Sequence, residues 1–232
     1  MKPRLISFKL CPFVQRVAIA LNQKGIAYDI EYIELSNPPK WFLDLSPLKK
    51  VPLLQVEDRA IFDSTAINEY IEDAYPNKLH PRDLVSRAIH RSWIEQSNQC
   101  TWSAFHLSVK NTEEQFNTVL DDLFEQFDKL ERAIEGLPFF DGTEFSLVDV
   151  SYAPLLQRLH FLSEIKPDVL DSRRHPKIVA WKDTLLGHEA VNNSCVPNLR
   201  TLYYELLWKR QGYISRFLDE TKRNPGVQKS LY

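Results

Sequence analysis

The segment Leu10-Cys11-Pro12-Phe13-Val14-Gln15-Arg16 joins a predicted strand to a predicted helix near the start of the chain. Residues Pro3 to Phe8 have the character of a short strand, and Pro12 to Lys24 carry apolar residues at helical spacing. Gly25 follows at the position where helices commonly end. Ala27 to Ile33 alternate between apolar and charged residues and predict a second strand. A strand–helix–strand unit of this kind favours a parallel pair of strands.

A hairpin and a further helix follow this unit. Val51 to Val56 and Ala60 to Phe62 predict two strands joined by a tight turn, and Ser64 to Ala74 predict a helix. The stretch from Tyr75 to Asp83 contains two prolines and little apolar periodicity, so we expect the domain linker there. The expected domains are residues 1–76 and residues 84–232.

Beyond the linker the pattern changes to long amphipathic helices, which predicts an all-α domain. Phe145 to Val150 carry a variant of the capping box, with Ser146 at the N-cap and Asp149 three residues later. The apolar residues at the two ends of this segment stand where a hydrophobic staple closes. The helices expected in this domain cover Leu84–Val109, Thr112–Ile134, the stretch from the capping box to about Ser163, a segment after His175-Pro176, and Asn198–Leu218.

Composition restricts the class of protein. The 232 residues are 44% hydrophobic and 26% charged, as in ordinary globular proteins, and the formal net charge of -2 gives no general attraction to nucleic acid. No apolar run approaches the length of a membrane span, and no targeting signal precedes Phe8. Three scattered cysteines do not form a disulfide framework, which favours free thiols in a reducing cytosol. We expect Cys100 and Cys195 to be structural.

Cys11 admits two interpretations. Pro12 suits the first position of a helix, so Cys11 would face the unpaired amides and the positive end of the helix dipole, which lower the pKa of a thiol. The alternative is a buried structural thiol, since free cysteine is among the most buried residue types. Val14 occupies the position where a C-x-x-C motif has its second cysteine. A redox cycle at Cys11 would therefore need an external thiol such as glutathione.

Two further segments are candidates for ligand binding. Val51-Pro52 opens a strand, and a cis bond there would leave the Val51 backbone free to pair with an extended peptide, although most X–Pro bonds are trans. Asp63-Ser64 stands at a strand-to-helix junction, where Ser64 could cap the helix, nearby amides could hold a carboxylate and Asp63 could take an ammonium group. An ordinary N-cap beside a solvated acid is the alternative.

These segments, in this order and followed by helices, resemble the cytosolic glutathione transferase superfamily. Leu10-Cys11-Pro12-Phe13 followed by Gln15-Arg16 is similar to the cysteine-type, omega-like branch. The other three matching motifs are Lys50-Val51-Pro52-Leu53-Leu54, Phe62-Asp63-Ser64-Thr65-Ala66-Ile67 and Phe145-Ser146-Leu147-Val148-Asp149. The resemblance implies an α/β thioredoxin-like N-terminal domain that holds glutathione and an all-α C-terminal domain.

The resemblance also implies roles for individual residues. Cys11 would be the catalytic thiol and would form a mixed disulfide with glutathione. Glutathione itself would be a co-substrate, and no metal is expected. Asp63 departs from the glutamate common in the family, and Pro38 stands where omega-like proteins often have a lysine. The expected glutathione-binding residues are Phe13, Lys40, Lys50, Val51, Pro52 (in a cis bond), Asp63 and Ser64, with Lys40 and Lys50 equally well explained as solvated surface.

The second substrate would lie against the first long helix and the C-terminal tail. Its expected residues are Trp102, Phe105, His106 and Tyr203, each of which could instead simply pack. The leading function is a glutathione-dependent thiol transferase that reduces disulfides, dehydroascorbate or glutathionyl adducts. The alternative is a non-enzymatic scaffold of the same fold that binds a partner or glutathione. The expected partners are glutathione, a small electrophilic or disulfide substrate and a second copy of the chain, with neither nucleic acid nor membrane.

Overall fold

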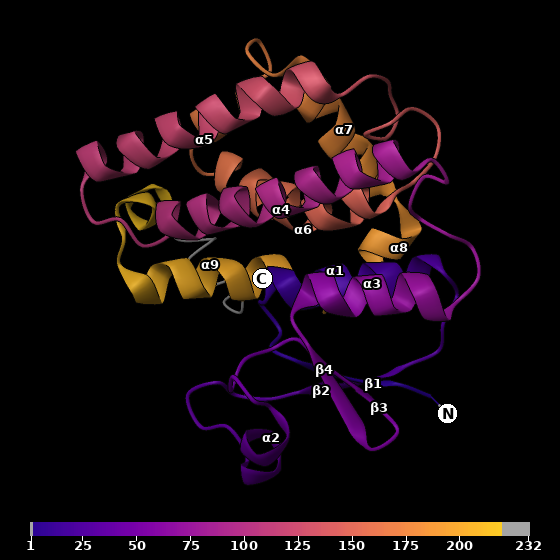
Figure 1. Cartoon of the computed structure of the whole chain (residues 1–232). Helices are drawn as coiled ribbons and strands as arrows, with labels where there is room; N and C mark the ends of the chain where they lie inside the picture. The colour runs from indigo at the N-terminus through magenta and orange to yellow at the C-terminus, as the bar shows by residue number, and fades with distance from the viewer. Residues whose placement is uncertain (1, 220–232) are drawn as a thin grey trace, which may run out of the picture.

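The computed structural model describes residues 2–219 (Figure 1). The first part of the chain confirms the expected order of strand, helix, strand and then hairpin and helix. Pro12 occupies the first position of the first helix, whose apolar side is fully buried, and Gly25 follows with a positive φ of 67°. The elements are β1 (Arg4–Ser7), α1 (Pro12–Gln23), β2 (Asp29–Tyr32), α2 (Lys40–Leu45), β3 (Leu53–Val56), β4 (Arg59–Phe62) and α3 (Ser64–Ala74).

The second part of the described chain is helical, as expected. Its last predicted helix is shorter than the sequence suggested, because Gln211 adopts a left-handed conformation and ends it. At Gly212, a Cβ atom would approach the Ser108 carbonyl oxygen to 2.9 Å, so the chain needs glycine there. The helices are α4 (Leu84–Leu107), α5 (Glu113–Ala133), α6 (Leu147–Ser163), α7 (Pro176–Gly187), α8 (Glu189–Asn192) and α9 (Leu199–Arg210), with 3₁₀ turns η1 (Pro167–Val169) and η2 (Tyr213–Phe217).

The four strands form one mixed sheet in the order β2-β1-β3-β4. Strand β1 pairs in parallel with β2 and antiparallel with β3, and β3 pairs antiparallel with β4. The register places Ile6 beside Leu53 and Leu53 beside Phe62. The end of β1, the start of β3 and the end of β4 therefore lie together at one end of the sheet.

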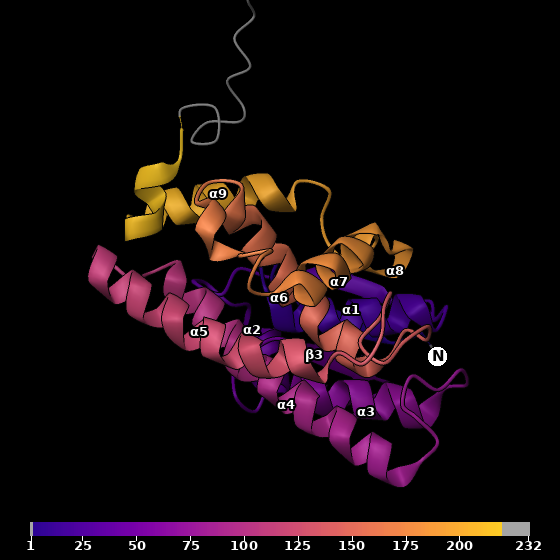
Figure 2. The same cartoon turned by 90° about the horizontal axis from the view of Figure 1, so that it is seen from above.

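The molecule is layered around this sheet. Figure 1 shows α1 and α3 between the sheet and the C-terminal helices, with α2 on the other side of the sheet. The main core joins α1 and α3 to the C-terminal helices, and a smaller core packs Ile6, Ile33 and Leu53 against Phe42 of α2. Seen from above, α9 lies beside α6, where the Tyr204 hydroxyl donates to the Phe161 carbonyl, and α3 runs beside the start of α4 (Figure 2). Within residues 2–219 no helix is long and apolar enough to span a membrane.

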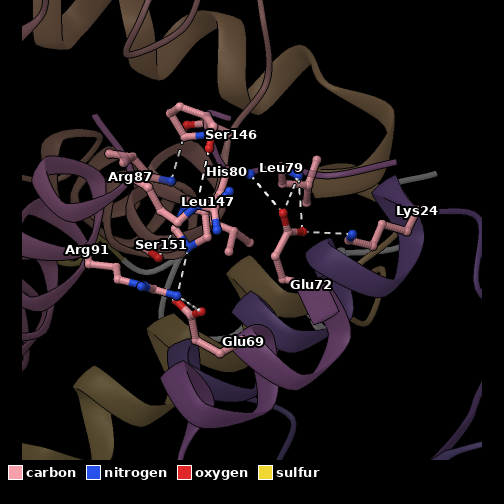
Figure 3. Close-up of polar contacts among 12 residues, drawn as sticks. Lys24, Glu69, Glu72, Leu79, His80, Arg87, Arg91, Ser146, Leu147 and Ser151 are labelled. Atoms are coloured by element: carbon pink, nitrogen blue, oxygen red, sulfur yellow. Dashed lines mark hydrogen bonds and ion pairs between the residues drawn. The ribbon is translucent and has the colours of Figure 1, made fainter. Parts of the chain in front are cut away.

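The segment between α3 and α4 is held by buried charges (Figure 3). Glu72 accepts hydrogen bonds from the backbone amides of Leu79 (2.9 Å) and His80 (3.0 Å) and pairs with Lys24 Nζ at 2.8 Å. Glu69 of the same helix contacts His80 in the connection and Arg91 in α4. The middle of the connection is therefore fixed to α3 through Leu79 and His80. The domain boundary within residues 77–83 stays a prediction.

The predicted capping box at the start of α6 is present. The Ser146 hydroxyl accepts a bond from the Val148 amide, and the Asp149 carboxylate accepts one from the Ser146 amide at 2.8 Å. Asp149 also accepts bonds from the Phe140 amide (3.0 Å) and from Trp181 Nε1 (2.7 Å). A local helix-start signal thus anchors the loop before α6 and the helix α7 to one carboxylate.

Candidate active site

Cys11 is the N-cap residue of α1. Its amide donates to the Phe8 carbonyl at 2.9 Å, which turns the chain out of β1, and its carbonyl accepts from the Gln15 amide at 3.2 Å. The amides of Phe13 and Val14 point toward the sulfur and lower the pKa of the thiol. The strand–helix junction expected from the sequence therefore exists, with Cys11 partly exposed at its turn.

The net pKa of Cys11 nevertheless differs from the expectation. Burial of the thiol raises its pKa above the ordinary value, and the amides of Val14 and Phe13 and the guanidinium groups of Arg158 and Arg16 only partly offset this. The prediction of a lowered pKa is therefore wrong. Burial removes hydration free energy from the thiolate. The attraction of the amides and arginines for the thiolate is smaller than this loss, so the pKa rises.

This raised pKa predicts a pH-dependent reactivity. We expect the rate at which iodoacetamide alkylates Cys11 to rise about tenfold per pH unit from about pH 6.5 to 8.5, because only the thiolate reacts and its concentration grows in that proportion below the pKa. Alkylation at Cys11 would be followed by peptide mass spectrometry. Cys100, whose pKa burial raises to about 12, should stay unmodified throughout and serves as the reference. A Cys11 rate that does not change over this range would show a thiol that is already ionised.

The two arginines beside Cys11 connect α1 to the C-terminal helices. Arg16 is fully buried and donates to the Ser151 carbonyl at 2.9 Å and to Ser97 and Thr101 of α4. Arg158 of α6 donates to Gln15 Oε1 at 2.8 Å. The role of Arg158 was missed at the sequence level. The sequence did contain a signal, since Arg158 stands within a mostly apolar helix. Charged residues are rarely buried without partners, so such a residue indicates a specific polar contact.

The Val51-Pro52 bond is cis, as the family resemblance implied. Pro52 is buried and Val51 is partly buried directly before β3. Lys50 is exposed, with its amide bonded to the Ser46 hydroxyl at 3.2 Å, and Lys40 is exposed at the start of α2. The geometry leaves both lysines in solvent, so their part in binding a ligand carboxylate stays a prediction.

The N-cap of α3 is one residue earlier than the sequence suggested. Asp63, and not Ser64, is the N-cap of α3, and its Oδ1 accepts bonds from the amides of Thr65 (2.9 Å) and Ala66 (3.1 Å). Its backbone φ of 69° turns the chain sharply from β4 into the helix. Ser64 is the first helical residue and is buried beside Arg16 and Asn68. The N-cap falls one residue earlier than expected because the Asp63 carboxylate accepts hydrogen bonds from two amides of the first turn at once.

Three of the predicted segments therefore meet at one end of the sheet. Cys11 follows β1, Val51-Pro52 precedes β3 and Asp63-Ser64 follows β4, and the register of these strands places them side by side. A thiol, a strand start and a helix N-terminus thus lie at the same end of the sheet. This arrangement suits an extended ligand that carries a thiol or disulfide in its middle and a charged group at its end.

A row of aromatic rings continues from this site along α4. The ring of Phe13 lies 5.9 Å from Trp102, which lies 5.6 Å from Phe105, and Phe105 lies 5.7 Å from His106. Trp102 is 52% exposed, so this row forms an open apolar surface beside Cys11. Tyr203 does not belong to the row. It is buried against Phe161, which lies 5.9 Å away.

Comparisons with known proteins agree with this architecture. Residues 5–79 match the family model for the glutathione S-transferase N-terminal domain, and residues 92–182 match the model for its C-terminal domain. The chain belongs to the glutathione S-transferase family. Within residues 2–219 no group of three or more metal-ligating side chains is present.

Its relatives include omega-class members of the family. The chain is 30% identical to glutathione S-transferase omega-1 of Sus scrofa, an alignment that covers 82% of this chain and 78% of that protein. It is 31% identical to pyrimidodiazepine synthase of Drosophila melanogaster over 81% of this chain and 78% of the relative. The crystal structure of glutathione transferase Omega 3C from Trametes versicolor superposes with a TM-score of 0.76 at 27% identity, over 84% of this chain and 89% of that one.

Proposed function

We propose that the chain is a glutathione-dependent thiol transferase with Cys11 as its nucleophile. The observation that carries the proposal is the convergence of Cys11, Val51-Pro52 and Asp63-Ser64 at one end of the sheet. If glutathione lies beside Cys11, a second glutathione can resolve the mixed disulfide, and a neighbouring cysteine of a C-x-x-C motif is not required. The omega-class relatives support the same assignment.

Glutathione is proposed to lie across these three segments. Its cysteinyl part pairs with the Val51 backbone, which a cis-proline leaves at the start of β3. Its γ-glutamyl carboxylate meets the Ser64 amide and hydroxyl at the N-terminus of α3, since the Thr65 and Ala66 amides already bond to Asp63, and its ammonium group meets Asp63. Lys40 or Lys50 receives the glycyl carboxylate, and Phe13 borders the sulfur. The exposed state of both lysines makes the glycyl end the weakest part of this pose.

The chemistry is thiol–disulfide exchange in two steps. The Cys11 thiolate attacks the glutathionyl sulfur of a mixed disulfide, forms a Cys11–glutathione disulfide and releases the other thiol. A glutathione thiolate then attacks that disulfide, which regenerates Cys11 and releases oxidised glutathione. The amides of Phe13 and Val14 and the two arginines stabilise the Cys11 thiolate both as nucleophile and as leaving group.

The second substrate is proposed to lie on the aromatic row of Trp102, Phe105 and His106. An open apolar surface accepts small disulfides, dehydroascorbate or glutathionyl adducts without strong selection among them. Arg210 lies 4.8 Å above the Phe105 ring and adds a positive charge at the far end of the row. The cytosolic location stays an expectation from the sequence.

A homodimer through both domains is proposed, with the start of α4 as part of its interface. Leu84, Val85 and Ile89 are 74%, 68% and 51% exposed there, and burial of each in an interface contributes about 1.5–3 kcal/mol. Arg91 bonds to Glu69 of α3 and holds the two helices together behind this apolar surface.

One mass measurement tests both the thiol and the dimer. We expect purified protein, mixed with oxidised glutathione and quenched in acid at short times, to carry one glutathione on Cys11 that excess reduced glutathione removes. Native mass spectrometry of unquenched protein at neutral pH should give twice the chain mass. An accessible Cys11 that never accepts glutathione would favour the scaffold function instead, and a monomeric mass would exclude the dimer.

A further inference from the structure

A second cysteine borders the same cavity as Cys11. The cavity measures about 10 Å³, close to the space of one water molecule, and both Cys11 and Cys195 line it. Cys195 lies in the turn between α8 and α9 and is partly exposed. From the sequence, a structural role is expected for Cys195. The fold instead places the two thiols across a space that a single small molecule fills.

Arg158 lines this cavity and acts on both thiols. Its positive charge lowers the pKa of Cys11 and of Cys195 against the larger effect of burial, which raises each pKa. Only 5% of Arg158 is exposed, and within residues 2–219 its Nε atom has no hydrogen-bond partner. A buried guanidinium with a free donor suits an anion in the cavity. A thiolate on either sulfur meets that requirement.

The turn that carries Cys195 is attached to the helix that Cys11 caps. Gln15 Nε2 of α1 donates to the Ser194 hydroxyl at 3.1 Å and to Gln157 Oε1 at 2.9 Å. Asn22 of the same helix donates to the Ala190 carbonyl at 3.1 Å. These bonds keep Cys195 beside the active cysteine. Cys100 differs, because it is buried against Gln126 and does not line the cavity.

We propose that Cys195 is a second redox thiol that resolves the mixed disulfide formed at Cys11. This inference rests on the proposed function of Cys11. The Cys195 thiolate attacks the Cys11 sulfur of the Cys11–glutathione disulfide, a Cys11–Cys195 bond forms, and glutathione leaves as a thiolate that takes a proton from water. Two molecules of reduced glutathione then reopen the internal disulfide and become oxidised glutathione.

The internal disulfide has a defined geometric requirement. The two Cα atoms of a disulfide lie within about 7 Å of each other, so the bond requires the turn at residues 193–198 and the start of α1 to reach that separation. Such a bond would join the start of α1 to the start of α9 and cover the Cys11 sulfur. The chain therefore replaces the absent C-x-x-C cysteine at Val14 with one from its C-terminal half.

The test follows the oxidation of three proteins over time. Wild type, Cys195→Ser and Cys100→Ser are mixed with equal amounts of oxidised glutathione, quenched in acid, which stops thiol–disulfide exchange, and mapped at acid pH by mass spectrometry without reduction. We expect wild type and Cys100→Ser to pass through the Cys11 adduct to a peptide pair linked by Cys11 and Cys195. Cys195→Ser should retain at least about tenfold more Cys11–glutathione adduct at late times. Thermal melting confirms that the variants remain folded.

Other outcomes separate the two proposals. An adduct on Cys11 that persists equally in wild type and Cys195→Ser overturns the role of Cys195 and leaves the proposed function standing. A disulfide that joins two chains through Cys195 also overturns the intramolecular assignment. If Cys11 takes no glutathione in any variant, the proposed function fails, and the resolving role fails with it.

Discussion

Replacement of Cys11 by serine is expected to lower kcat/KM for thiol transfer by at least about 10³-fold. Serine has nearly the same size and fits the N-cap of α1, so the fold and the glutathione site should persist. Its hydroxyl does not ionise near neutral pH and forms no mixed disulfide. The measurement is the initial rate at which reduced glutathione reduces a small mixed disulfide, with oxidised glutathione detected as the product.

The matched control for this variant is Cys100→Ser, which changes a buried thiol outside the Cys11 cavity. It should keep wild-type turnover. Calorimetric titration with reduced glutathione should give similar affinity for Cys11→Ser and wild type, which shows that only chemistry is lost. Full turnover by Cys11→Ser would remove Cys11 from the mechanism.

The largest expected loss of stability comes from Asp149→Ala. The carboxylate is fully buried and accepts four hydrogen bonds, from the amides of Phe140 and Ser146, the Ser146 hydroxyl and the Trp181 indole. Alanine leaves these donors unpaired in the core, which costs about 3–5 kcal/mol of unfolding free energy. Urea denaturation followed by tryptophan fluorescence measures the change.

Asp149→Asn separates the hydrogen bonds from the charge. Burial raises the pKa of Asp149, which shows that the site favours the neutral carboxyl more than water does. Asparagine keeps an acceptor for Phe140 and Trp181 and places an amide toward Ser146, so we expect a loss of about 1–3 kcal/mol, smaller than that of alanine. Equal losses in the two variants would mean that the four bonds do not act as described.

Local signals were sufficient for most of the secondary structure. The helix over Ser64–Ala74 and the capping box at Ser146 and Asp149 were predicted at their observed places, because the residues that define them are neighbours in sequence. The cis bond at Val51-Pro52 came from the family resemblance, since the usual preference of X–Pro bonds points the other way.

The parts that were missed depend on contacts between distant residues. The sequence indicated the helix N-terminus that lowers the pKa of Cys11. The burial that raises this pKa by a larger amount depends on the whole fold. Arg158 and Cys195 reach the Cys11 cavity from the C-terminal half of the chain. No spacing near Cys11 indicates them, so a one-dimensional pattern cannot reveal the second thiol.

The buried guanidinium of Arg16 has a consequence for synthesis of the chain on the ribosome. Its bonding partners, Ser97, Thr101 and the Ser151 carbonyl, are all made after the four strands are complete. Until α6 has emerged, this cation and the apolar side of α1 stay exposed to water and to chaperones. The strands of the N-terminal sheet can pair early. The contacts of α1 with α4 and α6 form only after the second half of the chain is translated.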